Sequence, residues 1–146
     1  MKIPYLITIF SLLAGNLGSI QAADEAQKSQ SDEEIRQKIV GTWIIDEVTS
    51  NGTYSAKGTI TYASDSNYVA KATVVEDGHS RNVKYEGIWQ VENGILTDTI
   101  TNATGIEGTP AKNFEQCKII RVNNQELVRY LGTKPSKFIT TEKRMK

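Results

Sequence analysis

The chain of 146 residues contains one cysteine, one histidine and three prolines, and its 17 basic side chains are balanced by 17 acidic ones. A lone cysteine, Cys117, cannot form an intramolecular disulfide, so stability must come from the core. Because there is no basic excess, the composition argues against binding to nucleic acid or to an anionic membrane. His79 alone, in a turn, supports neither a histidine-assisted nucleophile nor a cluster of metal ligands. We therefore expect no catalytic residues, no metal, no cofactor and no enzymatic activity.

The N-terminal segment has the layout of a cleaved export signal. Lys2 supplies a positive charge, residues 3–14 are apolar, and small residues lead to Ala22 and Ala23. A membrane anchor is the alternative, but the apolar stretch is shorter than the ~20 residues that a spanning helix needs. We expect a signal peptide over residues 1–22, a disordered tail over 23–30 and one domain over 31–146. The mature protein would be periplasmic or secreted, without an integral membrane span and without a cysteine for lipid attachment at the cleavage region.

Ordered structure is predicted to begin with a short helix. Ser31 and Glu34 have the spacing of a capping box, in which each side chain bonds the backbone N–H of the other residue. Ile35, Ile39 and Val40 then form one apolar stripe before Gly41. A helix this short is not stable alone, so its stripe must dock, and one end of the following domain is the obvious place.

The rest of the chain alternates apolar and polar residues in eight short runs that are separated by turn residues. Eight such strands in a meander close most economically into an antiparallel up-and-down β-barrel, because closure removes exposed strand edges. The predicted fold class is therefore all-β, with one short N-terminal helix capping an end of the barrel. The expected strands are Gly41 to Thr49, Thr53 to Ser64, Tyr68 to Glu76, Arg81 to Val91, Ile95 to Thr104, Phe114 to Val122, Gln125 to Leu131 and Ser136 to Arg144.

The inward faces of the second, third and fourth strands mix large aromatic residues with small ones. Small residues at mid-strand leave space in a barrel unless a neighbour fills it, so the sequence permits a ligand cavity. The alternative is that the aromatic rings fill the interior themselves. The small positions are Gly58, Ala70, Ala72 and Gly87, and the candidate ligand-binding residues are Tyr54, Tyr62, Tyr68, Tyr85 and Trp89.

Gly41-Thr42-Trp43, directly after the short helix, resembles the glycine-x-tryptophan signature of the lipocalins and the wider calycin superfamily. In that family the tryptophan closes the barrel end beside the helix, and a basic residue of the last strand packs across its ring. Arg144 matches the basic position, and antiparallel closure would bring it beside Trp43. The resemblance covers residues 35–144 in strand order and implies a small bacterial lipocalin-like protein, with Gly41, Trp43 and Arg144 as its structural signature.

Two further side chains, Asp98 and Glu142, have orientations that the sequence leaves open. Asp98 faces inward if Leu96 does, but we expect it on the surface because exposed aspartates far outnumber buried ones. Glu142 has the same ambiguity, and an inward Glu142 could pair with an inward Arg129 or with a ligand amine. We expect Cys117 to be a buried, unreactive thiol.

The favoured function is an exported lipocalin-like binding protein that holds a small apolar or amphipathic ligand inside the barrel. Ligands would enter at the end opposite the helix, where Gly105 to Lys112 is the longest connection. The alternative is an envelope protein-interaction module, for example a protease inhibitor barrel, that binds a protein partner through its rim and loops. A barrel enzyme with Asp98 as its acid or base is the least favoured hypothesis.

Overall fold

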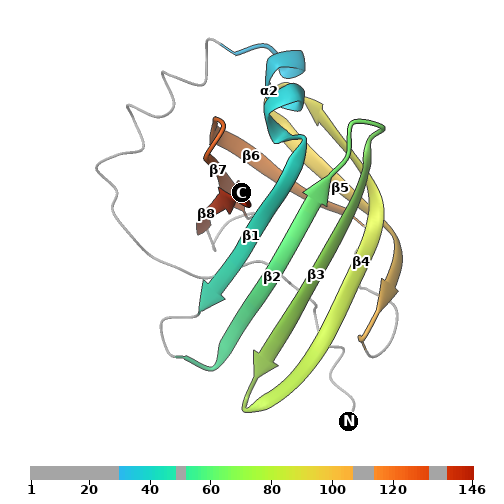
Figure 1. The fold of residues 1–146 in the computed structure, drawn as a ribbon, viewed down its shortest axis with the longest axis vertical. Coiled ribbons are helices and arrows are strands. Elements are labelled where there is room, and N and C mark those ends of the chain that lie inside the picture. The colour runs from blue at the N-terminus through green and yellow to red at the C-terminus, as the bar shows by residue number, and fades with distance from the viewer. Residues whose placement is uncertain (1–29, 49–51, 107–113, 132–137) are drawn as a thin grey trace.

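The computed structural model describes residues 30–48, 52–106, 114–131 and 138–146, which form a closed barrel of eight antiparallel strands in sequence order. The predicted fold class is confirmed. One helix, α2 (Asp32–Ile39), precedes the barrel and lies at the end where β1 begins (Figure 1). The strands are β1 (Gly41–Val48), β2 (Tyr54–Tyr62), β3 (Asn67–Glu76), β4 (His79–Glu92), β5 (Ile95–Thr104), β6 (Phe114–Val122), β7 (Glu126–Leu131) and β8 (Phe138–Arg144).

The first and last strands close the barrel through a short contact. Trp43 of β1 is paired with Arg144 of β8, and Ile44 with Lys143. The signal peptide expected over residues 1–22 and almost all of the tail expected over 23–30 lie outside the described residues. The same holds for most of the connection expected at Gly105 to Lys112 and for all of residues 132–135, between the last two expected strands.

Strand β4 begins earlier than the sequence predicted, because the preceding turn is tighter than expected. Asp77 and Gly78 both have positive φ angles, 49° and 79°. Two consecutive residues of this kind form the two-residue hairpin turn that matches the twist of antiparallel strands. His79 is therefore already the first residue of β4, paired with Glu76, and its side chain is exposed.

Helix α2 has the predicted capping box. The Ser31 hydroxyl accepts from the Glu34 N–H at 3.2 Å, and the Glu34 carboxylate accepts from the Ser31 N–H at 2.9 Å. Ile35 and Ile39 are buried, so the apolar stripe docks on the barrel as expected. The helix ends at Ile39, and Val40 caps it immediately before Gly41.

Candidate functional site: the barrel interior

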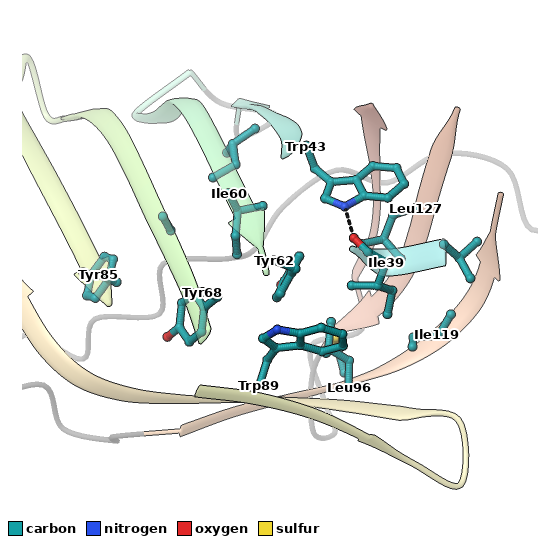
Figure 2. Close-up of a cluster of buried hydrophobic side chains, with 14 of the residues drawn as sticks. Ile39, Trp43, Ile60, Tyr62, Tyr68, Tyr85, Trp89, Leu96, Ile119 and Leu127 are labelled. Carbon is teal, nitrogen blue, oxygen red and sulfur yellow. Dashed lines mark hydrogen bonds between the residues drawn. The ribbon is translucent and has the colours of Figure 1, made fainter. Parts of the chain in front are cut away.

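The end of the barrel beneath α2 is closed by Trp43. Its indole N–H donates to the Ile39 carbonyl at 2.8 Å, a bond that Figure 2 shows among the side chains of the apolar cluster. The Arg144 guanidinium lies 4.3 Å from the centre of the Trp43 ring and also donates to the carbonyls of Lys38 and Val40. Both the burial of Trp43 and the position of Arg144 across its ring were predicted, and both are confirmed.

A second set of contacts fixes α2 across the same end of the barrel. Arg36 lies 5.1 Å from the centre of the Trp89 ring and donates to the Ser66 hydroxyl at 3.1 Å. The Asp32 carboxylate accepts from the N–H groups of Asn93 and Gly94, in the turn between β4 and β5, at 2.7 and 2.9 Å. The helix therefore caps the predicted end of the barrel.

The five aromatic residues proposed as pocket walls divide into two groups. Tyr62 packs edge-on against Trp89, with ring centres 5.4 Å apart, and its ring centre lies 6.0 Å from that of Tyr68. Trp89 also donates to the Ala63 carbonyl at 3.0 Å, and its ring is covered by the Arg36 guanidinium. These three rings therefore pack mainly against one another and against the residues that close the barrel end. Tyr85 lies apart from Tyr62 and Trp89 in Figure 2. Tyr54 is half-buried and lies on the same inward face of β2 as Tyr62.

The interior glycines do not leave empty space. A Cβ atom at Gly58 would lie 1.9 Å from the Lys71 carbonyl oxygen, and one at Gly87 would lie 1.9 Å from that of Thr99. The neighbouring strand's backbone thus occupies the position that a side chain would need. Gly58 and Gly87 are therefore explained by the close approach of a neighbouring strand and do not indicate a cavity.

A buried polar cluster lies in the barrel interior beside Tyr62, and it corrects the expectation for Asp98. Asp98 is 5% exposed, faces inward, and accepts from the Tyr62 hydroxyl at 2.8 Å. The Arg129 guanidinium, fully buried, donates to the Tyr62 hydroxyl at 3.2 Å and lies 3.8 Å from the Asp98 carboxylate. Exposed aspartates are commoner in general, but here the Tyr62 hydroxyl donates to the Asp98 carboxylate and the nearby Arg129 guanidinium offsets its charge.

Glu142 belongs to the same cluster. It is buried and forms a hydrogen-bonded ion pair with Arg129, the pairing that the sequence had left open. Burial works against the charge of Arg129, but the attraction of Glu142 and other nearby acidic groups raises its pKa well above the usual value. Burial also raises the pKa of Asp98 to about 6, although Arg129 and the Tyr62 hydrogen bond oppose the rise. The guanidinium therefore stays charged and neutralises part of the interior.

Two further interior carboxyl groups were missed by the sequence analysis. Glu47 is 9% exposed, and burial together with the charge of Glu142 raises its pKa to about 7. Glu115 is half-buried, stands opposite Asp98 in the β5–β6 ladder, and has its pKa raised to about 8 by burial and by the other carboxyl groups. The position of Glu47 could have been predicted from the sequence, because the alternation of β1 places Glu47 on the same inward face as Trp43 and Ile45.

Cys117 is buried, as predicted, and its thiol lies 3.9 Å from an Arg129 nitrogen. Burial raises its pKa, which keeps the thiol protonated and unreactive. Within the described ranges, no group of three or more histidine, cysteine, aspartate or glutamate side chains is arranged to hold a metal ion. In the same part of the chain, no helix is long and apolar enough to cross a membrane.

The outer face of the barrel has a shallow hollow of about 390 Å³ over β2, β3 and β4, near Gly58. Three lysines line it, Lys57, Lys71 and Lys84. Lys57 lies 3.8 Å from Asp46, and Lys84 forms an ion pair with Glu86 at 2.5 Å. Because acidic neighbours already offset two of the three charges, this surface is a weaker candidate site than the interior.

Comparison with protein-family models finds no match for this chain, and neither does comparison with curated proteins.

Proposed function

We propose that this protein is an exported, periplasmic or secreted lipocalin-like carrier that holds a small apolar or amphipathic molecule inside the barrel. The molecule would occupy the half of the interior away from α2. The protein has no enzymatic role in this proposal, and Asp98 serves to hold Arg129 and Tyr62 rather than to transfer protons to a substrate.

The main support is the contrast between the two halves of the barrel. Beneath α2 the interior is packed with aromatic and aliphatic side chains whose polar atoms are bonded. Toward the other end, both carboxylate oxygens of Glu47 and the hydroxyl of Tyr85 are buried without a hydrogen-bond partner among the described residues. Buried polar atoms are nearly always bonded in proteins, so a bound molecule is a natural partner for these two side chains.

The proposal is tested by native mass spectrometry of protein purified from its own host, followed by solvent extraction of the bound molecules. We expect an added mass that extraction removes. Binding of N-phenyl-1-naphthylamine, a neutral apolar fluorophore, would show that the emptied interior accepts a ligand. Protein that is empty when isolated and that does not bind the fluorophore would contradict the proposal.

A protein-interaction role is the second candidate, and one surface feature favours it. Ile88 and Phe114 are 52% and 48% exposed, and each is paired with Thr99, from opposite sides, in the β4–β5–β6 ladder. Two large apolar side chains so close on an outer face are typical of a contact surface. Ile88→Ser/Phe114→Ser would leave fluorophore binding unchanged in either case, and would impair the biological activity only if this surface binds a partner.

A further inference from the structure

The polar atoms of the barrel interior are unevenly divided between donors and acceptors. Within the described residues, the buried side-chain oxygens that lack a hydrogen-bond partner include both oxygens of Glu47, one oxygen each of Asp98 and Glu142, and the hydroxyls of Tyr85 and Thr140. All of these oxygens accept hydrogen bonds, and only the two hydroxyls also donate. A donor nitrogen without a partner in the described part of the chain, Nε of Arg144, lies at the closed end beside Trp43 and away from Glu47 and Tyr85. The missing partner is therefore a group rich in donors.

The charges in the interior also favour a partner that is rich in hydrogen-bond donors, because they are mostly negative. Among the described interior residues, four carboxyl groups (Glu47, Asp98, Glu115 and Glu142) face one guanidinium, that of Arg129. Arg129 is paired with Glu142 and lies beside Asp98. In this described part of the chain neither Glu47 nor the half-buried Glu115 forms an ion pair, and for the buried Glu47 a carboxylate without a paired cation is costly.

We propose that the bound molecule carries a protonated amine as its head group, and that this amine pairs with Glu47. The inference rests on the proposed function and names the chemical class of its ligand. Glu47 is nine-tenths buried and faces the interior from β1, with no partner of its own among the described residues. An ammonium group supplies up to three donors and one positive charge, which are the two properties that this part of the barrel lacks.

The neighbours of Glu47 suit an amphipathic amine. Burial raises the pKa of Tyr54, and the negative charge of Glu47 and the Tyr85 hydroxyl add to the rise, so Tyr54 lies within electrostatic reach of both. Tyrosine rings offer apolar surface to a hydrocarbon chain and a hydroxyl to its head group. A carboxylate head group would instead meet repulsion from Glu47 and Glu115. A bare metal ion would need converging ligands, which the described carboxyl groups do not provide.

The experiment compares three probes with the same chain length and different head groups: decylamine, decan-1-ol and decanoic acid. Each displaces N-phenyl-1-naphthylamine from delipidated protein at about pH 8, where Glu47 is ionised because its pKa is about 7. We expect decylamine to bind at least about tenfold more tightly than either other probe, as a charge-assisted hydrogen bond in a buried site implies. Ca²⁺ added alone should not displace the fluorophore.

The variant Glu47→Gln keeps the shape of the side chain and removes its charge. It should weaken decylamine binding about tenfold and leave decan-1-ol binding unchanged. Asp46→Asn is the matched control, because Asp46 is the adjacent carboxylate on the outer face of β1; it should change neither affinity. Equal binding of all three probes, or an unchanged decylamine affinity in Glu47→Gln, would overturn the amine assignment while leaving the carrier function intact. Failure of every probe and of the fluorophore would refute the carrier function itself.

Discussion

The Arg144 guanidinium lies 4.3 Å from the centre of the Trp43 ring, so the last strand of the barrel is tied to the first at the point where the helix docks. The same guanidinium donates to the carbonyls of Lys38 and Val40, which satisfies groups that the end of a helix leaves unbonded. One side chain thus joins α2, β1 and β8. This geometry gives a physical reason for a glycine, a tryptophan and an arginine at these positions, independent of any family resemblance.

Replacing Trp43 by alanine should destabilise the protein by about 3 to 5 kcal/mol, because a fully buried aromatic ring and its hydrogen bond to Ile39 are lost. Urea denaturation followed by circular dichroism measures the loss. Ile44→Ala is the control: Ile44 is the next residue of β1 but is 42% exposed, and its replacement should cost about 1 kcal/mol or less. A Trp43→Ala protein as stable as the control would show that Trp43 does not close the barrel.

Gly41 should not tolerate alanine. Its φ is +140°, and a Cβ atom would lie 2.0 Å from an Arg144 nitrogen, so the substitution must displace the guanidinium from Val40 and Trp43. Gly52→Ala is a reference without a clash, because Gly52 has a φ of +72° and nothing lies within 4 Å of its Cβ position. We expect Gly41→Ala to be the more destabilising of the two.

A double-mutant cycle tests the mechanism at Gly41. Once Arg144→Ala has removed the guanidinium, adding Gly41→Ala should cost less than it does in the wild-type protein. Strictly additive effects would show that the clash with Arg144 is not the cause.

The sequence predicted the strands and the closed end well, because those features depend on local alternation, turn residues and the length of one helix. The interior charges were harder to predict. Asp98, Arg129 and Glu142 each occupy the inward phase of a different strand, and each alone is better explained as a surface residue. Only their placement side by side, which depends on barrel closure and register, makes three buried charges compatible.

Breaking the buried ion pair should be far more damaging than breaking an exposed one. Arg129→Met leaves Glu142 and Asp98 buried without their cation and should cost about 3 to 5 kcal/mol. Arg121→Met is the matched control on the neighbouring strand: Arg121 pairs with Glu126 at 2.9 Å but is half exposed, so its loss should cost about 0 to 1 kcal/mol.

The double variant Arg129→Met/Glu142→Gln distinguishes an unpaired charge from a packing defect. It should recover part of the lost stability, since it removes one of the uncompensated carboxylates. If the double variant is less stable than Arg129→Met alone, the damage comes from lost packing around the guanidinium and not from the buried charge.

The unliganded protein should become less stable as the pH rises from about 4.5 to 8. Burial raises the folded-state pKa of Glu47 to about 7 and that of Glu115 to about 8, from an ordinary value of 4.5. In this range the folded protein holds protons that the unfolded chain has released. The stabilisation is therefore complete below pH 4.5 and is lost as the pH rises through the folded-state pKa values.

Glu47→Gln should flatten this dependence and leave the variant more stable than the wild type at about pH 8. Since one pKa unit corresponds to about 1.4 kcal/mol, a rise from 4.5 to about 7 sets an upper limit of about 3 kcal/mol on the difference. Urea denaturation at several pH values measures it, with Asp46→Asn as the control because its side chain is exposed and should leave the profile unchanged. An amine ligand should weaken the trend, because it stabilises the ionised form of Glu47 and leaves the contribution of Glu115 in place. If the wild-type protein instead gains stability with rising pH in the absence of ligand, the negative charges of these carboxylates are already compensated by cations in the folded state. That result would contradict the proposal that Glu47 needs an amine as its partner.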